Sequence, residues 1–84
     1  MKGPTFATLR YVLLQSGFED SSDPGKYHRF DHSIPKTWVL MPPYKDDDIV
    51  PWYHVNGARD LLDYRGIMSP EDFAEALRER SLAG

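Results

Sequence analysis

The feature that most constrains the fold is a pair of short runs, 27–32 and 36–41, in which aromatic and β-branched residues recur. Ser33, Ile34 and Pro35 between the runs favour a turn, so the pair predicts an antiparallel hairpin. The Ser-Ser-Asp-Pro-Gly stretch at 21–25 predicts another reversal just before it. The segment 18–22 would then supply a third strand, which makes a meander more stable than a lone hairpin.

A helix is predicted before these strands. Thr5 can act as its N-cap, and Gly17 suits the left-handed conformation in which many helices end. Between them, apolar residues recur at spacings of three and four, which places them on one helical face. These residues are Phe6, Leu9, Val12 and Leu13. This face is expected to pack against the sheet.

A second helix is predicted after the sheet. The prolines at 42–43 cannot donate ladder hydrogen bonds, so the sheet ends there, and the acidic segment 45–48 is expected to be a solvated turn. The helix begins at either Pro51 or the Asn56-Gly57 pair, and the pattern leaves both starts open. Gly66 is suited to end it.

The last helix has the clearest start. Ser69 is a typical N-cap, and Pro70 fits the first helical turn. Its apolar face comprises Phe73, Ala76 and Leu77. The sequence therefore predicts a single α+β domain over residues 1–84, with a helix, three antiparallel strands and two C-terminal helices packed on one sheet face.

Composition limits the chemistry. The chain has no cysteine, which excludes disulfides and thiol nucleophiles and favours a reducing, cytoplasmic compartment. No apolar run approaches the roughly 18 residues that span a bilayer, and no signal-peptide pattern is present, so no membrane association is expected.

The net charge of −3 argues against a broad basic surface. Residues 1–42 carry five cations against four acids and residues 43–84 carry five against nine, so RNA suits the first half and a basic protein partner the second.

No metal or nucleotide cofactor is predicted. His28 and His32 are four residues apart, but four residues of strand span about 13 Å, too far for both rings to hold one zinc ion. The acidic segment 45–48 lacks the spacing of a calcium loop. Neither a glycine-rich phosphate loop nor a Ser-His-Asp pattern occurs.

The segment 26–32 is the candidate site. On a strand, Tyr27, Arg29 and Asp31 share one face, and His28, Phe30 and His32 share the other. If Phe30 points into the core, the opposite face is exposed. We expect Lys26 and Lys36 to lie near one another across the hairpin, where cations and an aromatic ring could hold RNA phosphates and stack a base. The alternative is an ordinary solvated face with His28 as a half-buried core residue.

The chain resembles the HicA family of small toxins from toxin-antitoxin systems. The resemblance rests on the stretch from Gly25 to Phe30 followed by His32, on Val39-Leu40-Met41-Pro42, and on the spaced pattern from Arg59 to Leu77. It covers nearly the whole chain. It implies a fold similar to the double-stranded-RNA-binding domain, a ribonuclease that cleaves messenger RNA without a metal, and a partner antitoxin that inhibits it.

The family motif is Gly-Ser-His with an aromatic residue three positions after the histidine. The match places Gly25 on the glycine, Lys26 on the serine and Tyr27 on the histidine. Histidine suits RNA cleavage because its pKa near 6.5 lets it accept and donate protons, whereas tyrosine, with a pKa near 10, is a poor base at neutral pH.

Two functional hypotheses therefore remain open. In the first, the protein is a HicA-like RNA-directed toxin in which His28 is the general acid/base, Tyr27 contacts a nucleotide, and Lys26, Arg29 and Lys36 position phosphates. In the second, the protein is a catalytically inactive module of HicA fold that binds another protein. The tyrosine at position 27 and the acidic second half favour the second hypothesis.

Overall fold

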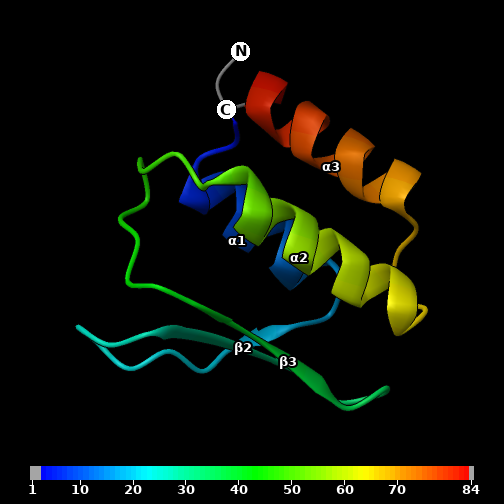
Figure 1. Ribbon diagram of the computed structural model, residues 1–84, viewed down its shortest axis with the longest axis horizontal. Coiled ribbons are helices and arrows are strands. Elements are labelled where there is room, and N and C mark those ends of the chain that lie inside the picture. Colours follow the sequence, from blue (N-terminus) through cyan, green and yellow to red (C-terminus); the bar gives the residue numbers. More distant parts are fainter. Residues whose placement is uncertain (1–2, 84) are drawn as a thin grey trace.

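The computed structural model describes residues 3–83 as one small sheet with helices on one side (Figure 1). In chain order the elements are α1 (Phe6–Gln15), β1 (Glu19–Asp20), β2 (His28–His32), β3 (Thr37–Met41), α2 (Trp52–Tyr64) and α3 (Pro70–Ala83). The strands form an antiparallel sheet in the order β1-β2-β3. The predicted α+β arrangement of a helix, three strands and two helices is confirmed.

The central strand β2 separates an inner face from an outer one. Phe30 pairs with Val39, and both side chains are buried beneath the helices. Arg29 pairs with Leu40, and both point to the outer face, where Leu40 is half exposed. The predicted orientation of β2 is therefore confirmed. The strand begins one residue later than predicted, because Tyr27 precedes the first ladder pair.

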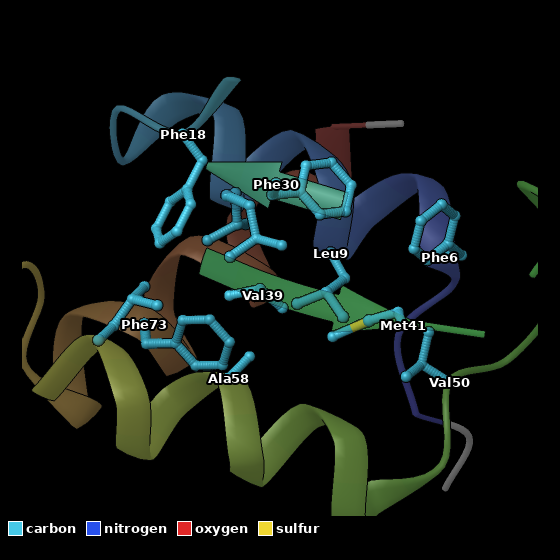
Figure 2. Close-up of a cluster of buried hydrophobic side chains, with 12 residues drawn as sticks. Phe6, Leu9, Phe18, Phe30, Val39, Met41, Val50, Ala58 and Phe73 are labelled. Atoms are coloured by element: carbon cyan, nitrogen blue, oxygen red, sulfur yellow. The ribbon is translucent and has the colours of Figure 1, made fainter. Parts of the chain in front are cut away.

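The core joins all three helices to the sheet (Figure 2). Phe6 of α1, Phe30 of β2 and Phe73 of α3 are fully buried. Burying a side chain of this size contributes about 1.5–3 kcal/mol relative to leaving it in water. The remaining buried apolar residues are Leu9, Val12, Leu13, Phe18, Val39, Met41, Val50, Ala58 and Leu62.

The helix boundaries follow the predicted signals. The Thr5 hydroxyl accepts a hydrogen bond from the Thr8 amide at 3.3 Å, and the Ser69 hydroxyl accepts one from the Asp72 amide at 3.2 Å. Gly17, after α1, has a φ of 101°, a conformation that side chains other than hydrogen rarely adopt. Helix α2 starts directly after Pro51, which decides between the two predicted starts.

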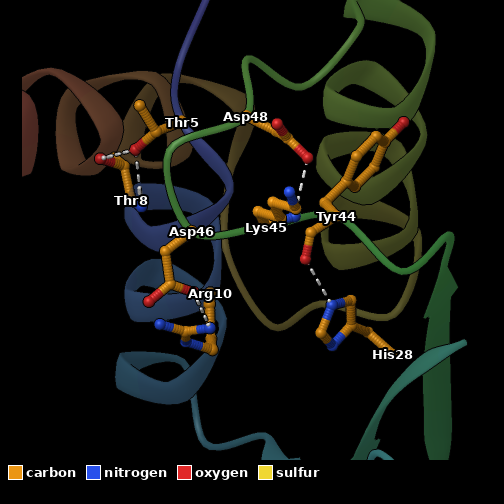
Figure 3. Close-up of polar contacts among 8 residues, drawn as sticks. All are labelled: Thr5, Thr8, Arg10, His28, Tyr44, Lys45, Asp46 and Asp48. Atoms are coloured by element: carbon orange, nitrogen blue, oxygen red, sulfur yellow. Dashed lines mark hydrogen bonds and ion pairs between the residues drawn. The ribbon is translucent and has the colours of Figure 1, made fainter. Parts of the chain in front are cut away.

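The segment between β3 and α2 crosses to the beginning of α1. The Phe6 amide donates to the Asp48 carbonyl at 2.8 Å, and the Ala7 amide donates to the Asp46 carbonyl at 3.0 Å. Arg10 extends the contact with an ion pair to the Asp46 carboxylate at 2.7 Å (Figure 3). The predicted acidic turn is exposed, as expected, and it also holds the first turn of α1 in place.

Within residues 3–83, none of the helices combines the length and apolar character needed to cross a membrane.

Candidate functional site

His28 lies at the first position of β2, on the inner face of the sheet. Its ring stacks on Phe6 with centroids 4.3 Å apart, and its Nε2 atom lies 2.9 Å from the backbone carbonyl oxygen of Tyr44 (Figure 3). Because a carbonyl oxygen only accepts hydrogen bonds, Nε2 must carry the proton. The neutral ring therefore has its basic lone pair on Nδ1.

The Nδ1 atom of His28 remains accessible. Among residues 3–83 it has no hydrogen-bond partner. Every buried side-chain nitrogen or oxygen in this part of the chain does have a partner, so Nδ1 is not one of the buried atoms. Nδ1 is therefore in contact with solvent, although the ring as a whole is partly buried. A ring oriented through one nitrogen and open at the other is the arrangement that general acid/base catalysis uses.

The other two histidines are arranged differently. The Nδ1 atom of His32 lies 3.0 Å from the Pro35 carbonyl oxygen, and its Nε2 atom lies 3.2 Å from the Ser16 carbonyl oxygen, so both ring nitrogens face acceptors. The Nδ1 atom of His54 lies 2.6 Å from the Tyr44 hydroxyl. His28 and His54 are thus each held through one ring nitrogen, and of the two it is His28 that lies beside Lys26.

His28 opens into a shallow hollow of about 550 Å³, which we call the His28 hollow. The turn 22–26, Asp20, Pro43 and Tyr44 complete its wall. Lys26 also lines this hollow. Gly25, with a φ of 75°, makes the tight turn that delivers Lys26 to the start of β2.

Two carboxylates also border the His28 hollow, from Asp20 and Asp23. Burial alone would raise the pKa of Asp20, but hydrogen bonds from Ser22, together with His28 and Arg10 nearby, hold that pKa below its ordinary value. Asp20 is therefore ionised at neutral pH. With one cation and two acids, the rim of the hollow is not electropositive.

Arg29 lies on the opposite, outer face. Its Nε atom donates to both oxygens of Asp31 at 3.1 Å, and its guanidinium lies 5.6 Å from the centre of the Trp38 ring. The hydrogen bond from Arg29 holds the pKa of Asp31 below its ordinary value. The charge of Arg29 is thus largely neutralised by its own neighbour.

The structure divides the predicted site residues between two places. Lys26 and His28 line the His28 hollow, whereas Arg29 and Lys36 line a separate hollow of about 610 Å³ on the outer face, beside Trp38. Tyr27 lines neither of these two hollows, and its side chain is 66% exposed.

The expectation that Lys26 and Lys36 lie near one another is wrong. The ladder runs from the pair His28–Met41 to the pair His32–Thr37, so the two lysines lie beyond opposite ends of β2. The strand between these pairs alone spans about 13 Å. The segment does not gather three cations at one point.

Sequence reasoning missed Tyr44 and His54. Tyr44 orients His28 through its carbonyl oxygen, and its hydroxyl contacts His54. Burial raises the pKa of the Tyr44 hydroxyl, with further contributions from Tyr53 and Asp48. Tyr44 is 16 residues from His28 and lies outside any regular element, so no periodicity could have linked the two.

Comparison with protein-family models, curated proteins and solved structures finds no match to this chain. Among residues 3–83, no three His, Asp or Glu side chains form a group that could hold a metal ion.

Proposed function

We propose that this protein is a HicA-like ribonuclease that acts on messenger RNA, with His28 as its general acid/base. The observation that carries the proposal is the orientation of His28, which lines the His28 hollow with its Nε2 atom held by the Tyr44 carbonyl and its Nδ1 atom without a partner among residues 3–83. The resemblance to the family supports a ribonuclease, while the motif match places Tyr27 on the family histidine and His28 one position later.

The chemistry follows from that geometry. Nδ1 of neutral His28 takes the proton of a ribose 2′-hydroxyl, and the 2′-oxygen attacks the adjacent phosphorus. The bond to the 5′-oxygen breaks, a 2′,3′-cyclic phosphate forms, and the protonated ring returns its proton to the departing 5′-oxygen. Lys26, on the wall of the same hollow, balances charge on the phosphate oxygens. Tyr27, being exposed, stacks on a base.

A dinucleotide substrate gives the sharpest test, because it is short enough to engage the His28 hollow alone. The purified protein should release a 2′,3′-cyclic product from the ribose dinucleotide in the presence of a metal chelator. It should leave the deoxyribose analogue intact. His28→Ala should reduce kcat by about 10²- to 10⁴-fold.

Two lysines provide a matched pair. Lys26→Gln should lower kcat/KM on the dinucleotide about tenfold, which corresponds to about 1.4 kcal/mol. Lys36→Gln makes the same change at the outer-face hollow and should leave this reaction unchanged. Contributions of Lys36 and Arg29 to RNA binding should appear only with longer RNA. Equal effects of the two lysine variants on the dinucleotide would count against the His28 hollow as the site.

In cells, induced expression without a partner antitoxin should arrest growth and degrade transcripts. The His28→Ala variant should relieve both effects at the same expression level. Normal growth with intact transcripts during wild-type expression would contradict the proposal.

A second candidate is a catalytically silent module that binds a protein partner. It is favoured by the outer sheet face, where Trp38 and Leu40 are 50% and 54% exposed and where Asp31 neutralises Arg29. Such a face suits a protein better than a phosphate backbone. If the wild-type protein is inert and Tyr27→His creates ribonuclease activity, the silent module is the correct assignment.

A further inference from the structure

Strand β3 is an edge of the sheet, and its free side carries unpaired backbone groups. The Arg29 carbonyl accepts from the Ser21 amide and the Arg29 amide donates to Ser22, so the backbone of Arg29 points toward β1. Neighbouring residues of a central strand point to opposite sides, so Phe30 points toward β3 and bonds with Val39. It follows that the amides and carbonyls of Trp38 and Leu40 point away from the sheet.

No backbone partner within residues 3–83 satisfies these groups at Trp38 and Leu40. They project beside a groove of about 300 Å³ between β3 and α2, which we call the β3–α2 groove. Figure 2 shows α2 lying along β3 on the side away from β2. The helix contributes Tyr53, Gly57 and Leu61, which are spaced by four residues and share one face.

The residues of β3 themselves carry no feature that blocks pairing. Exposed edge strands generally carry a charged residue, a proline or a bulge that blocks another strand. Strand β3, with the sequence Thr-Trp-Val-Leu-Met, has none of these. No Lys, Arg, Asp or Glu lines the β3–α2 groove, whose one titratable imidazole is that of His54. Gly57 borders open space in the groove, since a Cβ atom there would meet nothing within 4 Å.

The geometry points to a second copy of this chain as the occupant, paired antiparallel through β3 about a two-fold axis at Val39. This register sets Trp38 of one copy opposite Leu40 of the other. Because both residues direct their backbone groups outward, each such pair exchanges two hydrogen bonds. The strand is therefore complementary to itself.

The side chains agree with this register. On the outer face, each Trp38 ring would lie beside a Leu40 side chain, an aromatic–aliphatic cross-strand pair that stabilises sheets. Neither strand brings a charge, so no like charges meet at the axis. The dimer would have a continuous six-stranded sheet. This inference does not depend on the chemistry proposed for His28.

Sedimentation across micromolar to millimolar protein concentrations tests the dimer, with Leu40→Glu as the informative variant. In the monomer the new carboxylate faces Arg29 across the ladder, so the fold should persist, which circular dichroism checks. In the dimer both Trp38–Leu40 cross-strand contacts would be replaced by a carboxylate beside the partner's indole ring, so the dissociation constant should rise about tenfold. Ile34→Glu is the matched control, because Ile34 is 86% exposed in the β2–β3 turn, and it should dimerise as the wild type does.

Amide hydrogen exchange locates the contact. Raising the protein concentration should slow exchange at Trp38 and Leu40 while leaving Val39, already bonded within the sheet, unchanged. Gly57→Leu, which fills the groove rather than changing the strand, should also weaken dimerisation. A wild-type protein that stays monomeric at millimolar concentration would overturn the inference, as would unchanged dimerisation of Leu40→Glu. A peptide of sequence 36–42 can also be added to the protein. If the protein does not dimerise but the peptide slows amide exchange at Trp38 and Leu40, the edge binds a strand from another protein instead.

Discussion

The Nε2 atom of His28 is held 2.9 Å from the backbone carbonyl oxygen of Tyr44, so the polypeptide backbone itself selects the tautomer of this ring. No side-chain substitution at position 44 removes that acceptor. Tyr44 is in turn fixed by its hydroxyl contact with His54 at 2.6 Å and by packing against Phe6. The orientation of His28 therefore depends on the path of the chain after the sheet.

The tautomer can be observed directly. Neutral His28 should carry its proton on Nε2, and two-bond ¹⁵N–¹H correlation spectra of the imidazole rings should show this pattern. The same spectra in urea provide the control, because the carbonyl contact is lost on unfolding. A folded protein with the His28 proton on Nδ1 would contradict both this geometry and the proposed base.

Phe30 should be among the residues most sensitive to truncation. Its side chain is fully buried, so Phe30→Ala should lower the free energy of unfolding by about 3–5 kcal/mol. Tyr27→Ala, three positions earlier and 66% exposed, should change it by less than about 0.5 kcal/mol. Urea denaturation of the two variants measures the difference. Similar losses would show that β2 turns its faces the other way.

Two glycine substitutions should change the free energy of unfolding in opposite directions. Gly17→Ala should destabilise the protein by about 1–2 kcal/mol because of the left-handed backbone, and the new Cβ would also lie 3.0 Å from Nε2 of His32. Gly57→Ala adds a methyl group where nothing lies within 4 Å, inside α2, and should stabilise the protein by about 0.5–1 kcal/mol. Thermal unfolding of dilute samples, where association is negligible, measures both changes.

The ion pair between Arg10 and Asp46 should give a defined acid sensitivity. The hydrogen bond from Arg10 holds the pKa of Asp46 below its ordinary value of 3.8. A carboxyl group whose pKa is lower in the folded state stabilises the fold fully at pH values above its pKa in the unfolded chain. This stabilisation is lost as the pH falls through its pKa in the folded protein. Carboxyl NMR titration should place Asp46 below 3.8, and Arg10→Gln should return it toward that value.

Local signals in the sequence were sufficient for the elements and for the faces of β2. Large apolar residues in alternation force one strand face inward, so placing Phe30 in the core also placed His28 beside it and Arg29 outside. The caps at Thr5 and Ser69 depend only on residues within one turn, which is why they were predictable.

Relationships between distant segments were not predictable in the same way. The separation of Lys36 from Lys26 is an exception, because the predicted turn at 33–35 already places the two lysines at opposite ends of the hairpin. Tyr44 reaches His28 only because the segment after β3 folds back over α1. By contrast, the ion pair between Arg29 and Asp31 could have been predicted from the sequence, because residues two apart on a strand share a face.

The crossing of segment 44–48 over α1 also constrains the order of folding during synthesis. The amides of Phe6 and Ala7 reach acceptors that lie about forty positions later in the chain. Although α1 leaves the ribosome first, its opening turn cannot acquire these acceptors until Asp48 has emerged. A nascent chain that stalls after β3 would therefore expose a half-capped helix and an uncovered apolar sheet.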